Sequence, residues 1–308
     1  MSVLFNTYSR FLINQMKKND EINFKDLKFI DRVSAINNIS YLNDNNKYHL
    51  FNMYYPSEVI DKRKLPLMID IHGGGWIYGD KDLNRFHNAY YSSQGMVTLS
   101  MSYRLIPKVK FIDMVKDLFS FFHYIEKEKD NLNIDFKNVL LSGDSAGGHL
   151  ALLIHAINNS EEMQKIFGVT HFNIEFKMLN IEHPVPYLNH LFIKENETKS
   201  LANSCMMKAF FGSRFRKNPL YLSSSLDNFV SKVKFPKTII VTSSLDSFRP
   251  YTLKAYEDLK VNNVDVTLKD YENEVHVFEV SRYDKEKSRE YNDFVIKEFF
   301  KLIKGDNL

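Results

Sequence analysis

The 308-residue chain has a single cysteine, Cys205. One thiol cannot form an intramolecular disulfide, so the disulfide framework of many secreted proteins is excluded. The sequence shows no secretory signal segment, because the apolar residues near Met1 are soon interrupted by Arg10, Lys17 and Lys18. We therefore expect a cytoplasmic protein.

Long hydrophobic runs and an excess of one charge are also missing. No apolar run approaches the ~20 residues that span a bilayer, so we predict no integral membrane segment. The 41 basic and 38 acidic residues are interspersed and leave a net charge of +3. Nucleic-acid binding needs clustered cations to displace condensed counterions, so we predict no nucleic-acid partner.

Signatures of metal and phosphate binding are absent as well. No Cys/His spacing indicates zinc, and no G-x-x-x-x-G-K-[ST] loop indicates a nucleotide phosphate. We predict that the protein needs no metal and no cofactor. Its chemistry must then come from side chains and main-chain amides.

What the sequence does have is a serine between glycines. Residues 143–149 read Gly-Asp-Ser-Ala-Gly-Gly-His, after an apolar run at 138–141 and before an amphipathic stretch at 150–156. Glycines two places before and after Ser145 allow a tight turn between a strand and a helix. Such a turn exposes the hydroxyl, so we predict that Ser145 is a nucleophile, with Asp144 as part of its motif.

A second glycine motif follows an apolar run at 67–71. It reads His72-Gly73-Gly74-Gly75-Trp76, and a flexible turn alone would need only one or two of these glycines. Main-chain N–H groups left uncovered by side chains can face an oxygen that becomes negative in a tetrahedral intermediate. Each such donor contributes about 3–4 kcal/mol in a dry site. The run therefore predicts an oxyanion hole.

Together the two motifs resemble the signatures of the hormone-sensitive-lipase-like branch of the α/β-hydrolase superfamily. Residues 103–107, Tyr-Arg-Leu-Ile-Pro, are similar to the family's Tyr-Arg-Leu-Ala-Pro, and 276–278, His-Val-Phe, resemble its His-Gly-Phe. Residues 235–249 resemble its strand and Asp-x-Leu-Arg-Asp segment, although Pro250 replaces the second acid. The resemblance implies an α/β-hydrolase fold: a mostly parallel eight-stranded sheet with helices on both faces and a helical cap.

The order of residues supports a catalytic triad. In this fold the nucleophile, acid and base follow one another along the chain, as Ser145, Asp246 and His276 do. The base must reach the serine, and the acid must orient the imidazole. Asp246 is preferred because it lies just past a strand end, where open α/β sheets carry their functional loops. Three other aspartates fall within the next helix or strand: Asp258, Asp265 and Asp270.

The remaining site residues are assigned partly by resemblance. In this fold the residue after the nucleophile supplies one oxyanion N–H, here Ala146, and the resemblance implies Gly74 and Gly75 as the others. It also implies that His72 orients the glycine loop, whereas Trp76 and Tyr78 either wall the pocket or brace that loop. His183, directly before Pro184 in an irregular loop that contains two prolines, is a weak candidate for the pocket lining. Six histidines are interpreted as exposed or structurally satisfied: His49, His87, His123, His155, His171 and His190.

The chain is expected to form one domain, residues 1–308, because Ser145, Asp246 and His276 are too far apart in the sequence to belong to one of two smaller domains. Strand formers at 36–42 and 48–55 predict a hairpin, followed by alternating strands and helices from residue 66 onwards. The pattern loosens after residue 174, which favours an insertion over a sheet element. We predict a cap from about 180–230 and from 1–32, although the latter could be an ordinary helix on the sheet.

The resemblance implies a carboxylesterase that cleaves small esters of short to medium acyl chain through an acyl-enzyme intermediate. Alternatives on the same triad are an arylformamidase or an amide or acetyl-ester deacetylase. A non-catalytic binding protein on this fold usually lacks a triad member, and charges between 194 and 208 disfavour a membrane-bound lipase. The partner is then a small-molecule ester, and the resemblance also allows a homodimer.

Overall fold

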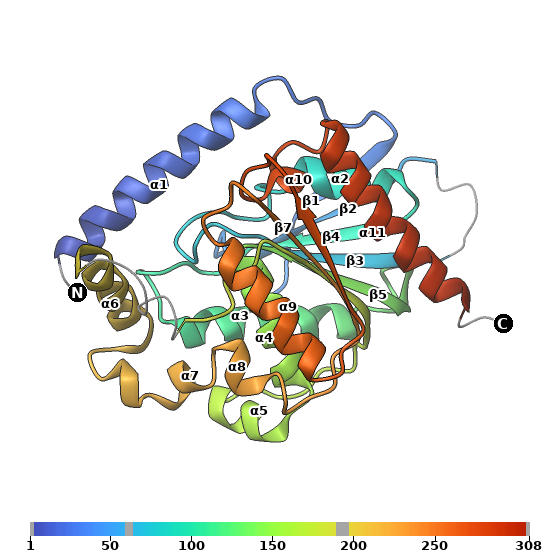
Figure 1. Ribbon diagram of the computed structural model, residues 1–308. Coiled ribbons are helices and arrows are strands. Elements are labelled where there is room, and N and C mark those ends of the chain that lie inside the picture. Colours follow the sequence, from blue (N-terminus) through green and yellow to red (C-terminus); the bar gives the residue numbers. More distant parts are fainter. Residues whose placement is uncertain (1–2, 59–63, 189–196, 306–308) are drawn as a thin grey trace.

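The structure, a computed structural model, describes residues 3–58, 64–188 and 197–305 (Figure 1). One eight-stranded sheet forms its centre, with the strand order β1-β2-β4-β3-β5-β6-β7-β8. Antiparallel pairing joins β1, β2 and β4, and parallel pairing joins all later neighbours. The strands are β1 (Val33–Ser40), β2 (Leu50–Pro56), β3 (Leu65–Ile71), β4 (Val97–Met101), β5 (Ile134–Asp144), β6 (Phe176–Glu182), β7 (Lys237–Ser243) and β8 (Val266–Tyr271).

Helices cover both faces of the sheet because its central strands are apolar on both sides. In β3, Leu67 and Ile69 pack into the core beneath α3 and α4, whereas Met68 points to the opposite face, beneath α2 and α11. This alternation is the two-residue period of a strand. The longer helices are α1 (Val3–Phe24), α2 (Arg85–Ser93), α3 (Phe111–Lys127), α4 (Ala146–Asn158), α6 (Glu197–Phe211), α9 (Arg249–Val261) and α11 (Glu286–Gly305).

Shorter helices occupy the connections. They are α5 (Glu161–Phe167), α7 (Pro219–Leu222), α8 (Leu226–Phe229), α10 (Phe278–Ser281) and a 3₁₀ turn, Phe215–Lys217. The α/β-hydrolase architecture expected from the sequence is confirmed, including the hairpin that opens the sheet. In the described residues, no helix combines the length and the apolar character needed to cross a bilayer.

The expectation that the chain leaves the sheet after residue 174 was wrong for β6. This strand lies between β5 and β7, and six of its seven residues are buried. Its polar residues Asn180 and Glu182 obscure the apolar pattern, but both are fully buried and hydrogen-bonded. Distant partners such as Tyr291 satisfy these groups, and a local sequence pattern does not reveal them.

The segments expected to form the cap meet at one end of the molecule. Helix α1 packs against α6 and α10 (Figure 1). Several large apolar side chains of α1 remain exposed, with Phe11 57% and Ile22 70% accessible. Residues 189–196, which include His190 and part of the expected cap, lie outside the described residues.

Candidate active site

Ser145 lies in the tight turn between β5 and α4. Its φ of 52° and ψ of −112° are outside the regions that non-glycine residues ordinarily occupy. The turn can close because Gly147 has no side chain: a Cβ at this position would overlap the main-chain oxygen of Ile71. The Ser145 amide donates a 2.7 Å hydrogen bond to the Glu182 carbonyl at the end of β6. Strain is therefore held at the residue expected to react.

The structure brings the three expected triad residues together. Nε2 of His276 lies 3.0 Å from Oγ of Ser145. Nδ1 of the same ring lies 3.0 Å from Oδ2 of Asp246, although this N–H does not point straight at the oxygen. Such catalytic contacts commonly tighten when substrate binds. The His276 side chain is 30% exposed whereas that of Asp246 is fully buried, so the reactive side faces solvent and the acid does not.

Asp246 is held as a carboxylate by its surroundings. Burial by itself would raise the pKa of Asp246, but the imidazoles of His183 and His276 hold that pKa well below its ordinary value. The Phe248 amide donates to Oδ1 at 2.8 Å. The acid is therefore ionised and fixed in orientation at neutral pH.

The glycine motif presents main-chain amides beside Ser145. Gly74 has φ of 95°, and its carbonyl accepts hydrogen bonds from Ile77 and Tyr78, which closes the loop. The Gly73 amide is engaged by Asp144 at 2.8 Å. Among the described residues the amides of Gly74 and Gly75 have no hydrogen-bond acceptor. They are therefore available to an oxyanion.

Ala146 adds a third amide to this group. It is the first residue of α4, so its N–H has no partner within the helix. Aligned peptide dipoles also give a helix N-terminus a partial positive charge, which favours a developing negative oxygen. Within the described part of the chain, the three amides expected from the sequence thus have no hydrogen-bond acceptor.

Buried aromatic rings brace the glycine loop. The His72 ring stacks on Tyr103 with centroids 4.3 Å apart, and the Tyr103 hydroxyl donates to the His72 carbonyl at 2.7 Å. Burial lowers the pKa of His72, so the ring is neutral. Trp76 is 4% exposed and packs edge-on against His149 and Phe210. Trp76 therefore braces the loop rather than standing free as a pocket wall.

Asp144 connects the two glycine motifs. Its Oδ1 accepts 2.8 Å hydrogen bonds from the Gly73 amide and from Asn84 Nδ2. Burial, together with the nearby Asp70 carboxylate, raises the pKa of Asp144 to about 8. The side chain is therefore largely protonated at neutral pH. It acts as a neutral hydrogen-bonding group rather than as a charge.

His183 is positioned differently from its expected place in the pocket lining. Its side chain is fully buried behind Asp246, and Nδ1 lies 2.7 Å from Oδ2 of that residue. Nε2 lies 3.2 Å from Oε2 of Glu279 in α10. No sequence motif points to Glu279, which lies three residues after His276. One ring nitrogen of each imidazole and one carboxylate oxygen of Asp246 lie within 4.8 Å of one another, so the three side chains form a single cluster.

Five other histidines have the structural partners expected of them. Buried His87 faces Glu182 at 3.4 Å, and His155 contacts the Lys234 carbonyl at 2.8 Å. The remaining three contact carboxylate or carbonyl oxygens: His49, His123 and His171. His190 is outside the described residues.

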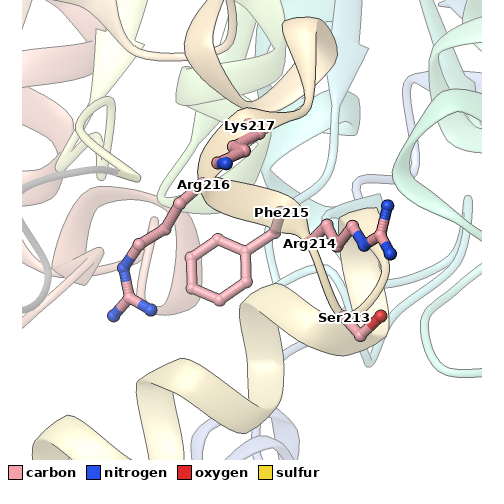
Figure 2. A pocket seen from close by; sticks show the side chains of 5 residues that line it. All are labelled: Ser213, Arg214, Phe215, Arg216 and Lys217. Atoms are coloured by element: carbon pink, nitrogen blue, oxygen red, sulfur yellow. The ribbon is translucent and has the colours of Figure 1, made fainter.

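A surface cavity of about 310 Å³ is lined by Ser213–Lys217, a segment that contains none of the candidate site residues. Figure 2 shows Arg214 and Arg216 extending to opposite sides of Phe215. The two guanidinium groups therefore do not converge on one ligand position. No triad or oxyanion residue lines this cavity, so it has no part in the candidate site.

A family model described as the alpha/beta hydrolase fold matches residues 68–280, which include both glycine motifs and the three candidate triad residues. The chain belongs to the α/β-hydrolase family. Its motifs and its esterase relatives place this α/β hydrolase in the hormone-sensitive-lipase-like branch.

A crystal structure of esterase B from Lactobacillus rhamnosis with a C6-C4 SN3 inhibitor is 28% identical to this α/β hydrolase. It superposes with a TM-score of 0.92, covering 99% of this chain and 98% of that chain. Carboxylesterase 20 of Arabidopsis thaliana is 32% identical over 112 residues, which are 32% of this chain and 34% of the relative. A putative alpha/beta hydrolase of Acanthamoeba polyphaga mimivirus is 26% identical over 30% of this chain and 28% of its own length. The chain thus matches about a third of these two curated relatives.

Proposed function

We propose that this α/β hydrolase is a serine carboxylesterase that cleaves small esters of short to medium acyl chain. Ser145 Oγ attacks the ester carbonyl while His276 Nε2 takes its proton. His276 then returns the proton to the departing alcohol, which leaves an acyl group on Ser145. A water molecule, activated by the same imidazole, hydrolyses this acyl-enzyme.

The observation that carries this proposal is the 3.0 Å contact between Ser145 Oγ and His276 Nε2, next to amides that have no acceptor among the residues that the structure describes. The amides of Gly74, Gly75 and Ala146 would hold the negative oxygen of the tetrahedral intermediate. Asp246 would orient His276 and stabilise its imidazolium. Each contact between donor and oxyanion acts where the charge develops, so it lowers the barrier rather than only binding substrate.

Support for a short acyl chain comes from a structural neighbour. Esterase B from Lactobacillus rhamnosis has been solved with a C4-C4 SN3 tributyrin phosphonate. The match to that structure has 27% sequence identity and covers 100% of this chain and 98% of the esterase B chain. We therefore propose butyrate esters, including tributyrin, as substrates. A cytoplasmic location is proposed from the lone thiol of Cys205, and cell fractionation would test it.

The family resemblance also leads us to propose one catalytic domain capped by residues 1–32 and about 180–230. An assembly of two copies through an edge strand or the cap is proposed on the same ground. Light scattering coupled to size-exclusion chromatography would test it, since a monomer mass at micromolar concentration contradicts the dimer. The catalytic proposal depends on neither feature.

The decisive experiment measures hydrolysis of p-nitrophenyl esters from two to twelve acyl carbons, with p-nitroacetanilide and N-formylkynurenine alongside. We compare wild type, Ser145→Ala and, as a matched control, Ser93→Ala. The Ser93 hydroxyl, at the end of α2, donates to the Tyr90 carbonyl and accepts from the Gln94 side chain. We expect turnover of short esters that Ser145→Ala loses and Ser93→Ala keeps. Turnover of the amide or formamide alone would favour the alternative hydrolases, and no Ser145-dependent turnover would contradict the proposal.

A further inference from the structure

One carboxylate oxygen of Asp246 is shared by two imidazoles. Oδ2 lies 2.7 Å from Nδ1 of His183 and 3.0 Å from Nδ1 of His276. The two rings stand edge to face with centroids 5.3 Å apart. An ordinary serine triad needs only one of them, so His183 requires an explanation of its own.

Both nitrogens of His183 face carboxylates. Nδ1 contacts Asp246, and Nε2 lies 3.2 Å from Glu279. Ionised carboxylates only accept protons, so a proton on each ring nitrogen is the state that suits a carboxylate on either side; the contact of Nε2 with Glu279 is an ion pair without hydrogen-bond geometry. Burial opposes that charge, but Glu279 and Asp246 outweigh it and raise the pKa of His183 to about 10.

Glu279 has no other comparable role. Its side chain is fully buried, and neither carboxylate oxygen has a hydrogen-bond partner among the described residues, so its close contact is with His183. Glu182, the chain neighbour of His183, faces His87 instead. A buried carboxylate without an opposite charge nearby is costly, so Glu279 stabilises the positive charge of the His183 ring. The same ring also contacts Asp246.

We propose that His183, held between Glu279 and Asp246, is a positioning residue that fixes the Asp246 carboxylate against His276. This inference rests on the proposed function, because it concerns the acid and base of the proposed triad. His183 also connects the acid to the nucleophile through the main chain. It contacts Asp246, and it directly follows Glu182, whose carbonyl accepts a hydrogen bond from the Ser145 amide.

His183 contacts the acid of the proposed triad rather than the substrate. Its positive ring offsets part of the negative charge buried at Asp246 and Glu279, and its short contact to Oδ2 restrains the carboxylate that faces His276. Among the described residues, the charged or titratable groups facing His183 are Asp246, Glu279 and His276.

The test reads ring charge directly, by ¹⁵N NMR of protein labelled at its ten histidines. The signals of His183 are assigned by their loss in His183→Gln. In wild type we expect both of its nitrogens to have imidazolium shifts at pH 8.5, about two units above the ordinary histidine pKa of 6.5. Shifts of a neutral ring at pH 8.5 would overturn the proposal.

The second arm measures turnover. In folded His183→Gln kcat should fall roughly 10-fold while KM stays within a few-fold of wild type, because Asp246 no longer holds the His276 ring in a fixed orientation. His155→Gln is the matched control, since His155 is another buried histidine, but its ring nitrogens face the Lys234 carbonyl and Asn159 and its ring packs on Phe235. It should leave kcat and KM near the wild-type values. A kcat in folded His183→Gln equal to that of wild type would overturn the proposal.

Glu279→Gln keeps the idea testable where His183→Gln does not fold. Loss of this carboxylate should lower the pH at which His183 loses its imidazolium signal by at least one unit, and an unchanged pH would contradict the pairing. Neither NMR measurement needs turnover. If no ester is hydrolysed, the proposed function fails while the charge of His183 is still decided.

Discussion

The Gly73 amide donates a 2.8 Å hydrogen bond to Oδ1 of Asp144, the residue directly before the nucleophile. This bond joins the glycine loop to the turn that holds Ser145, although the two motifs are far apart in sequence. The Gly73 amide is therefore engaged by Asp144, whereas the amides of Gly74 and Gly75 are the two proposed to hold the oxyanion. The geometry of the candidate oxyanion hole therefore depends on the side chain of Asp144.

Asp144→Asn should keep this geometry, because the amide oxygen still accepts from Gly73, whereas Asp144→Ala should not. We expect kcat to fall roughly 10- to 100-fold in the alanine variant, as for other small displacements of catalytic groups. The asparagine variant should stay within a few-fold of wild type. Equal losses in the two variants would show that the hydrogen bond is not what matters.

The same residue predicts a pH dependence of stability. The pKa of Asp144 is about 8 in the folded protein and close to 3.8 when unfolded. Between these values the folded state holds a proton that the unfolded state has lost, so this residue makes the fold less stable as pH rises. Asparagine does not titrate. The stability of Asp144→Asn relative to wild type should therefore increase from pH 4 to 8, by at most about 1.4 kcal/mol per unit, and level off above. Urea denaturation across this range checks it.

Asp246→Asn should lower kcat on the order of 10⁴-fold, because an amide cannot stabilise the His276 imidazolium. Neighbouring imidazoles lower the pKa of Asp246, so its ionisation stabilises the fold above the unfolded pKa near 3.8, and that contribution is lost as pH falls. The stability gap between wild type and Asp246→Asn should thus narrow below pH 4. Asp258→Asn is the control, since Asp258 bonds to Tyr187 and Lys254. A comparable loss of kcat there would contradict the assignment.

The sequence was informative where glycine determines local geometry. The turn at Ser145 and the loop at Gly74 were foreseen because only residues without a Cβ permit those close approaches and that positive φ. The parallel sheet followed from apolar strands alternating with helical stretches. In each case the determining residues are near one another in the chain.

The features that were missed depend on distant partners. Strand β6 reads as polar because Asn180 and Glu182 are satisfied only after folding, by groups such as Tyr291 and His87. The role of His183 depends on Asp246 and Glu279, which approach it only in the folded chain. Pairings of this kind leave no periodic trace, so the sequence could suggest His183 only as a pocket residue and Glu279 not at all.

Replacing Val277 by glycine should stabilise the protein. Val277 has φ of 51° and ψ of 38°, the left-handed region that a β-branched residue strongly disfavours. Glycine relieves a strain of about 1–2 kcal/mol but makes the unfolded chain more flexible, so Val277→Gly should gain up to about 1 kcal/mol. Val275→Gly, at a 56% exposed position of the same loop without positive φ, should instead lose stability. Thermal denaturation distinguishes them, and equal losses would show that Val277 is not strained.

Met16 should control acyl-chain preference. Its Cε lies 3.6 Å from where a Cβ on Gly75 would stand, so α1 places this side chain over the proposed oxyanion loop. The Tyr78 hydroxyl anchors the same helix through a 2.6 Å hydrogen bond to Asp20. Truncating Met16 removes volume beside the reacting carbonyl, and a pocket typically discriminates each methylene by about 10-fold or more. In Met16→Ala the ratio of kcat/KM for octanoate over butyrate esters should therefore rise by roughly 10-fold. Phe11→Ala alters an exposed side chain of α1 and should leave the ratio unchanged. If both variants shift it equally, α1 acts through its stability rather than through contact with substrate.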